Sequence, residues 1–301
     1  MAIVMTILML LQIGLSIGGA IFIFMLVKAW REKRTSEKST NVMAIGAIGG
    51  FANFCDTLGV GSFAIKTAGY KQFNLVDDKD LPGTLNAQAA LATVAQALIF
   101  LTAVEVDMTT MVSLIVAACL GATIGARIVS GLDRQMIRLI MGCALMIVAL
   151  LMLAGRLELF PLGGTELGLS GTKLAIAIVG NFIFGALMTV GIGLYAPCMT
   201  MIYLLGMNPI AAFPIMMCSC AFLCFFSAGN FIQRKALNTR AALSVAITGP
   251  IAVLIAAFIV KSLDLDTLAW LVTFVVLYTS ITMFRSWSNS RNQSHAQTLI
   301  D

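Results

Sequence analysis

Two charged residues stand in the middle of a long apolar stretch of this 301-residue chain. They are Asp56 and Lys66, and the run that they bound, "DTLGVGSFAIK", also contains two glycines. A carboxylate inside an apolar segment can carry a proton, coordinate a cation or hold a lysine in place, and a lysine ammonium can attract an anion. The alternatives are a structural ion pair, a carboxylate that caps a helix, and a lysine that snorkels toward water.

The composition indicates an integral membrane protein. Hydrophobic residues make up 59% of the chain, charged residues make up 11%, and the mean hydropathy is +0.97, which leaves too little polar surface for a soluble domain. Apolar runs of about 18 residues or more can span a bilayer as helices. The first such run is predicted to be a retained helix and not a cleaved signal peptide. The predicted segments lie near 3–27, 42–69, 84–104, 108–130, 136–154, 173–205, 210–231, 241–262 and 267–284.

Several classes of function are excluded by the reactive residues. All seven cysteines fall in apolar segments without a C-x-x-C pair, which predicts small buried side chains and no redox framework. The single histidine, His295, lies in the polar tail, so we predict neither a metal nor a cofactor. The sequence has no H-E-x-x-H, G-x-S-x-G or P-loop motif, so we do not predict an enzyme. The net charge of +5 indicates basic cytoplasmic loops and not a nucleic-acid partner.

The charged loops favour one topology. If every segment crosses once, the basic loop with Arg134 and Arg138 falls outside the cell, against the usual bias of Lys and Arg toward the cytoplasm. If the two long segments 42–69 and 173–205 instead enter the membrane and return to the side they came from, the external loops keep only Arg156, Lys173 and Lys261 as basic residues. We therefore predict an external N-terminus and a cytoplasmic C-terminus in the cell membrane.

An internal repeat supports the same topology. Shifting the chain by 132 residues without a gap lays "DTLGVGSFA" over "MTVGIGLYA". Each unit then contains one broken or re-entrant segment and three full spans, so the second unit is inverted relative to the first, as in many secondary transporters. The matched residues are Thr57, Gly59, Gly61, Ala64, Pro82, Ala89 and Leu91 with Thr189, Gly191, Gly193, Ala196, Pro214, Ala221 and Leu223.

The fold class predicted is thus an all-α polytopic membrane protein with an inverted-topology repeat and an extra N-terminal helix. The predicted units are an N-terminal helix with a basic cytoplasmic loop at 1–40, a first repeat at 41–172, a second repeat at 173–284 and a polar cytoplasmic tail at 285–301.

The glycine-containing breaks are the predicted substrate site. Irregular backbone at membrane depth persists only where it is buried in protein or lines a wet cavity, and the helix that follows presents N–H donors to an anion. Glycines between tightly packed helices are the alternative. Asp56 is the candidate for ion coupling, while its counterpart in the second repeat is Met188 and that of Lys66 is Cys198. The candidates for substrate binding are Thr57, Gly59, Gly61, Ser62, Lys66, Asn86, Gln88, Thr189, Gly191, Gly193, Tyr195, Cys218 and Ser219.

The two repeated stretches resemble a known family. "GAIGGFANFCDTLGVGSFA" with "LPGTLNAQA", and more weakly "GALMTVGIGLYAPCMTMIYLLGMNPIAAFP", resemble the sulfite exporter TauE/SafE family over about residues 41–284. The first run departs from the commonest pattern, which has three glycines and a proline, whereas the second retains Pro197. From the family we carry over only the two glycine turns and their flanking hydroxyl groups.

The resemblance implies a secondary transporter that exports small sulfur-containing or organic anions such as sulfite or sulfonates. An anion channel and an uptake permease for small carboxylates are the alternatives. The expected partners are the anionic substrate, membrane lipid, and a proton or sodium ion that couples transport. No nucleotide-binding signature is present to supply another source of energy.

Overall fold

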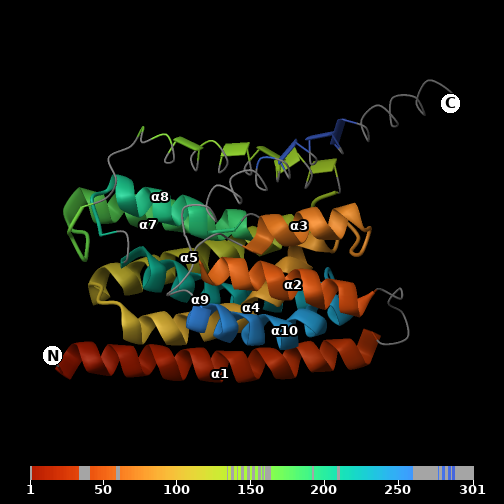
Figure 1. Ribbon diagram of the computed structural model, residues 1–301, viewed down its shortest axis with the longest axis horizontal. Coiled ribbons are helices and arrows are strands. Elements are labelled where there is room, and N and C mark those ends of the chain that lie inside the picture. Colours follow the sequence, from red (N-terminus) through yellow and green to blue (C-terminus); the bar gives the residue numbers. More distant parts are fainter. Residues whose placement is uncertain are drawn as a thin grey trace.

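The computed structural model describes residues 2–33, 41–58, 62–133, 164–191, 193–208 and 211–259, with separate positions between 135 and 159 and between 277 and 288. Every named element in this part of the chain is a helix, in agreement with the predicted all-α class (Figure 1). The helices are α1 (Ala2–Lys33), α2 (Val42–Thr57), α3 (Ser62–Gln72), α4 (Leu81–Ala103), α5 (Met108–Val129), α7 (Gly171–Met188), α8 (Tyr195–Leu204), α9 (Ala212–Gln233) and α10 (Thr239–Ile259).

Six of these helices, α1, α4, α5, α7, α9 and α10, are long and apolar enough to cross a membrane. Their length and composition confirm the prediction of a multi-pass membrane protein. The structure describes only separate positions of the predicted span near 136–154 and a few at the end of the one near 267–284.

The first broken segment is a helical hairpin, called here the first hairpin, formed by α2 and α3. The side chain of Asn41 caps α2 by accepting the Ala44 N–H at 3.1 Å. Asn53 and Lys66 are hydrogen-bonded near the inner ends of the two helices, whereas the Tyr70 hydroxyl donates to the Ile45 carbonyl, 3.4 Å away, near their outer ends. This pairing makes α2 and α3 antiparallel, so both outer ends lie at one end of the bundle (Figure 1).

The second broken segment forms a second hairpin, α7 and α8, which enters from the opposite end. Gly180 of α7 faces Met201 of α8, and Lys173 near the start of α7 lies beside Gly206, just past the end of α8. The segments that lead into and out of this hairpin are also joined, because the Asn208 N–H donates to the Glu166 carbonyl at 2.8 Å. The chain therefore leaves this hairpin where it entered. The predicted repeat boundary at 172/173 falls in the first turn of α7.

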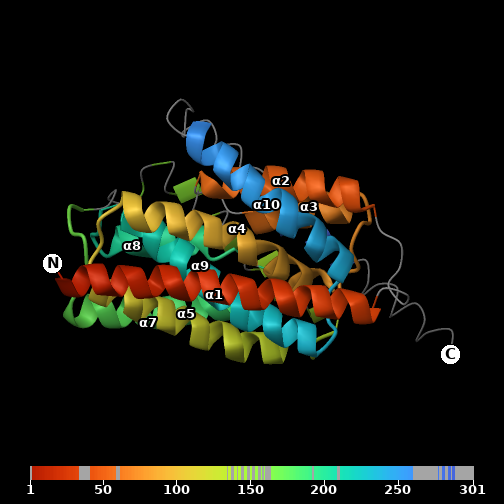
Figure 2. The same cartoon turned by 90° about the horizontal axis from the view of Figure 1, so that it is seen from below.

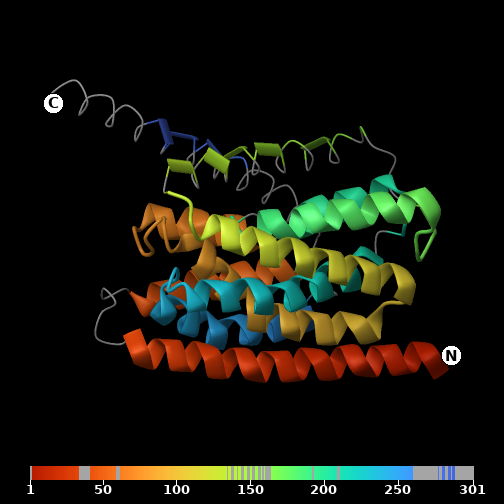
Figure 3. The same ribbon diagram turned by 180° about the vertical axis from the view of Figure 1, so that it is seen from behind.

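Each hairpin packs its first helix along a long helix from the other half of the chain. α2 lies along α10 and α7 lies along α5 (Figures 2 and 3). Glycines permit the close approach: a Cβ at Gly121 would collide with the Phe182 carbonyl, and one at Gly185 would collide with the Ala118 carbonyl. Gly121 and Gly185 are therefore helix-packing residues.

At the centre, α4 and α9 run antiparallel. α4 also packs on α10, and α9 also packs on α5. Asn86 of α4 accepts a hydrogen bond from the Ser227 hydroxyl of α9 at 2.8 Å. α1 lies on the outside, mainly against α9, α4 and α10, and most of its large side chains are exposed, such as Phe24 at 69%. The core is thus built by the two central helices, with the hairpins inserted beside them.

Candidate substrate site

The inner ends of the two hairpins meet in the interior of the bundle. The Tyr195 hydroxyl, at the start of α8, donates to Oε1 of Gln96 on α4 at 2.6 Å. The Gln96 amide nitrogen in turn donates to Asp56 Oδ2 and Thr57 Oγ1 of the first hairpin, both at 3.1 Å. A Cβ at Gly193 would lie 3.7 Å from the Phe63 Cβ. The sequence-predicted residues Asp56 and Thr57 are thus brought together with Tyr195, which follows Thr57 by 138 positions in the chain.

Asp56 caps the second helix of its own hairpin. Its Oδ1 accepts the backbone N–H of Ser62, the first residue of α3, at 2.5 Å, and the Asp56 side chain is 4% exposed. The N–H donor that the sequence suggested for an anion at Ser62 is therefore occupied by a carboxylate of the protein. The capping alternative for Asp56 is confirmed.

Lys66 is wholly buried, which contradicts the snorkelling alternative. Its side chain is 0% exposed, and its ammonium donates to Asn53 Oδ1 at 2.9 Å and to Ser62 Oγ at 3.3 Å. Among the described residues no carboxylate forms an ion pair with this ammonium, Asp56 included. Asp56 and Lys66 therefore do not form a direct salt bridge. Ser62 links them, since its N–H binds the carboxylate and its hydroxyl binds the ammonium.

Two further polar groups of the first hairpin lack partners. Asn53 Nδ2 and Thr67 Oγ1 are buried and make no hydrogen bond within the described part of the chain. Buried polar groups are nearly always hydrogen-bonded, so such exceptions require an explanation. The first hairpin therefore carries a buried ammonium with neutral partners and two unused groups able to donate, a combination that suits an anion.

The amides at the start of α4 already bond to other helices. Asn86 Nδ2 donates to the Met188 carbonyl at the end of α7 at 3.1 Å, and Gln88 donates to the Ala241 carbonyl and accepts the Tyr70 hydroxyl, each at 3.0 Å. These contacts are the helix-to-helix bonding that amides often make in membrane proteins. Asn86 and Gln88 are therefore not among the residues that bond to Gln96.

On α9, Ser219 bonds to Asn181 of α7, with 3.2 Å between Ser219 Oγ and Asn181 Nδ2. Cys218 is fully buried, and it is Cys220 whose sulfur lies 3.5 Å from the Met188 sulfur at the end of the first helix of the second hairpin. Ser219 thus supports packing between α7 and α9.

The glycine turns differ from one another. Gly59 and Gly61 lie outside the described residues. In the second hairpin it is Gly191 that has a positive φ, +99°, whereas Gly193 does not. A side chain at Gly191 would be strained, because L-residues rarely adopt this conformation. The Thr189 hydroxyl donates back to the Ala186 carbonyl at 2.6 Å, so it closes the end of its own helix.

Three residues of the site, Asn53, Thr67 and Gln96, were not among the sequence-based candidates. Asn53 precedes Asp56 by three positions and Thr67 follows Lys66, so a search for polar residues next to the charges could have found both. Gln96 carries no such signal, because only the tertiary packing brings this turn of α4 to the inner ends of the hairpins.

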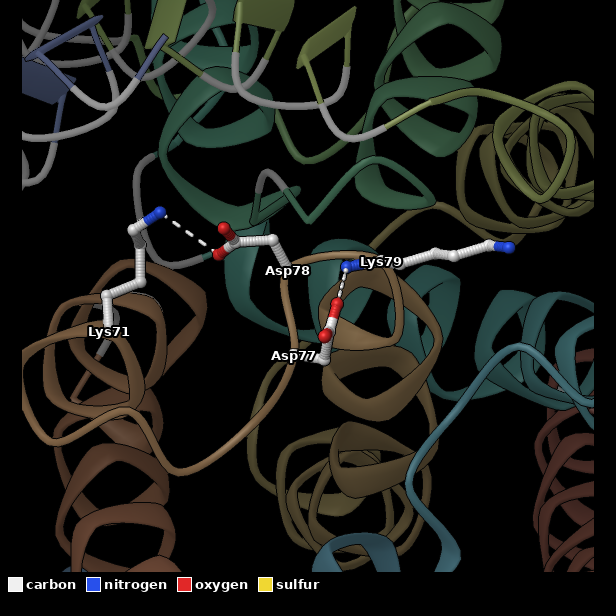
Figure 4. Close-up of polar contacts among 4 residues, drawn as sticks. All are labelled: Lys71, Asp77, Asp78 and Lys79. Atoms are coloured by element: carbon white, nitrogen blue, oxygen red, sulfur yellow. Dashed lines mark hydrogen bonds and ion pairs between the residues drawn. The ribbon is translucent and has the colours of Figure 1, made fainter. Parts of the chain in front are cut away.

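The outer end of the first hairpin offers a contrast. Figure 4 shows Lys71, in the last turn of α3, paired with Asp78 at 3.0 Å, and the backbone N–H of Lys79 bonded to the Asp77 carboxylate at 2.9 Å. Lys71 and Asp78 are partly exposed, at 16% and 17% for their side chains. Such exposed ion pairs contribute little to the free energy of unfolding, and this one closes the turn after α3.

Comparisons with known proteins agree with the resemblance seen in the sequence. No curated protein and no solved structure matches the chain. The family described as "Sulfite exporter TauE/SafE" matches residues 2–152, which include the first hairpin, α4 and Gln96. This match covers half of the chain, and the chain belongs to the sulfite exporter TauE/SafE family.

Proposed function

We propose that this protein is a secondary transporter that exports small sulfur-containing or organic anions, such as sulfite or sulfonates, across the cell membrane. Membership of a family of membrane transporters gives the class of function. The observation that carries the proposal is the buried Lys66 ammonium with neutral partners, on a hairpin whose inner end meets that of a second hairpin. A small anion would neutralise this ammonium and accept from Asn53 and Thr67.

An inverted repeat would provide the alternating access. Two observations support it. A shift of 132 residues moves α5 (Met108–Val129) onto 240–261, within two residues of α10 at both ends, and moves α4 (Leu81–Ala103) onto 213–235, within two residues of α9. The packing of α2 along α10 also corresponds to that of α7 along α5. Hairpins that enter from opposite ends and meet inside are a plan by which one site can open to either side in turn.

Charge is confined to one half of this arrangement, since Met188 and Cys198 occupy the positions of Asp56 and Lys66 in the second repeat. We assign anion binding to Lys66 and ion coupling to Asp56. A proton on Asp56 would leave the Lys66 charge for the anion alone, which couples the movement of the two. Sodium at the same carboxylate would have a similar electrostatic effect.

Counterflow in proteoliposomes tests the proposed function. Vesicles loaded with unlabelled sulfite, taurine or sulfoacetate should accumulate the labelled form of the anion that the protein carries, with a rate that responds to an imposed pH gradient. A carrier must return its site to exchange one anion for another, so counterflow distinguishes it from a channel. Rapid equilibration without transient accumulation would overturn the proposal in favour of a channel.

The orientation gives a separate prediction. Lys79 and Glu105 are exposed and lie beyond opposite ends of α4, and we place Lys79 in the cytoplasm and Glu105 outside. In a variant without native cysteines, Glu105→Cys should react with an impermeant maleimide in intact cells, whereas Lys79→Cys should react only after the membrane is opened. Glu105 is preferable to Asp107, whose carboxylate caps α5. Labelling of Lys79→Cys from outside would show that the orientation is the opposite of the proposed one.

A further inference from the structure

A single amide bonds to both hairpins. Gln96 belongs to α4, yet its nitrogen donates to Asp56 and Thr57 of the first hairpin and its oxygen accepts the Tyr195 hydroxyl of the second. All four side chains are at most 4% exposed. These three hydrogen bonds, called here the Gln96 bridge, join the inner ends of the two hairpins.

The partners determine which way the amide points. The Thr57 hydroxyl donates its hydrogen to the Asn53 carbonyl at 2.9 Å, so its oxygen can only accept from Gln96. Both oxygens of Asp56 also accept, one from Gln96 and the other from the Ser62 N–H. An ionised carboxylate has acceptors only. The Gln96 bridge as it stands therefore fits an ionised Asp56.

A proton on Asp56 disturbs the surroundings of this carboxylate. On Oδ2 its O–H would face the Gln96 N–H, whereas on Oδ1 it would face the Ser62 N–H and leave the bridge itself intact. If the Gln96 amide turned over, its oxygen would accept from the Asp56 O–H, but its nitrogen would face the Tyr195 oxygen and the Tyr195 hydroxyl hydrogen would lose its acceptor. Each arrangement forfeits at least one buried hydrogen bond, which is costly where water cannot replace it.

Within the described part of the chain, no second carboxylate lies near Asp56 to take the proton instead. α4 has no charged residue, and the only one in α10 is Arg240, next to its first residue. The titratable groups that face Asp56 are Cys55 on its own helix, Lys66 of α3, Tyr195 of α8 and Cys220 of α9. Each of these is a weaker acid than a carboxylic acid in water, so Asp56 is the group that takes up a proton on acidification.

We propose that Gln96 is a positioning residue that couples proton uptake at Asp56 to the separation of the two hairpins. Ionised Asp56 accepts from Gln96 in the bridge as it stands; a proton on Oδ2 forms one O–H bond, neutralises the carboxylate and turns the amide over, so the Tyr195 hydroxyl loses its acceptor and the second hairpin is held less firmly. The inference rests on the proposed function, because it supplies the link between the coupling ion and the movement around the anion site.

An inter-hairpin crosslink measures this separation directly. The Cβ positions of Phe63 and Gly193 are 3.7 Å apart, within the range of about 3.5–4.5 Å in which a disulfide forms. Phe63→Cys with Gly193→Cys, in a background without native cysteines, should therefore crosslink on oxidation. The rate is compared with and without Tyr195→Phe at the same pH, so that the pH dependence of thiol oxidation itself cancels.

The matched control is Tyr70→Phe. Tyr70 is also fully buried and also donates to a glutamine oxygen of α4, that of Gln88 at 3.0 Å, but it belongs to the first hairpin alone. At pH values near 8 we expect Tyr195→Phe to slow crosslinking about fivefold, the factor that one hydrogen bond of ordinary net strength represents, and Tyr70→Phe to leave it unchanged. As the pH is lowered until Asp56 takes up its proton, the effect of Tyr195→Phe should shrink.

A Tyr195→Phe effect that is missing, independent of pH, or shared by Tyr70→Phe would overturn the proposal. If the protein with the cysteine pair does not fold, the pH profile of anion exchange is measured in the protein with its native cysteines. Tyr195→Phe should flatten this profile and Tyr70→Phe should retain it. The opposite result would also contradict the role proposed for Gln96. Crosslinking requires no substrate, so it can be measured even if the protein does not transport these anions. Failure of the proposed function and failure of the proposed role of Gln96 are therefore distinguishable.

Discussion

Lys66→Gln is expected to raise the anion concentration needed for half-maximal transport by about 5- to 150-fold, while the protein remains folded. The substitution keeps a hydrogen-bond donor near Asn53 and Ser62 but removes the charge. A hydrogen bond from a buried charged group to an anion contributes about 1–3 kcal/mol, and this range corresponds to the expected factor. Concentration dependence of counterflow measures it.

Lys71→Gln is the matched control, because it makes the same change on the same helix five residues further on. Lys71 pairs with Asp78 at the partly exposed outer end of the hairpin, so its loss should change stability by no more than about 1 kcal/mol and leave transport intact. Equal effects of the two substitutions on the half-maximal concentration would show that Lys66 does not contact the anion.

Asp56→Asn is expected to abolish the response of transport to a pH gradient while anion-for-anion exchange continues. An asparagine oxygen can still accept the Ser62 N–H and cap α3, but the amide cannot release a proton at ordinary pH. Its nitrogen would face the Gln96 nitrogen, so a loss of about 1–3 kcal/mol in the free energy of unfolding should accompany the change. Uptake with and without the gradient, together with thermal unfolding, tests both effects.

The double variant Asp56→Asn with Lys66→Gln decides whether the two charges are only a structural pair. The structure shows no direct ion pair between them, since Ser62 stands between carboxylate and ammonium. The losses of the single variants should therefore combine without rescue. Recovery of both stability and transport in the double variant would refute the separate roles given to Asp56 and Lys66.

Hydropathy and charge were enough to predict much of the architecture. A bilayer demands long apolar helices with their own hydrogen bonds satisfied, so a run such as 108–130 could be identified from its composition, and the structure has α5 at Met108–Val129. The family was also recognisable from the repeated glycine-containing stretches. Asp56 and Lys66 attracted attention because a charge within an apolar segment is rare.

The tertiary structure alone decided what these charges touch. The sequence allowed Lys66 to snorkel or to pair with Asp56, but the antiparallel return of α3 along α2 turns its ammonium onto Asn53 and Ser62. Gln96 gave no distinct sequence signal, because an amide in an apolar helix looks like any helix-packing residue. Its contacts follow from the meeting of three elements distant in the chain. Local sequence determines whether a segment is a buried helix, whereas hydrogen-bond partners depend on which helices the packing of glycines and small side chains brings together.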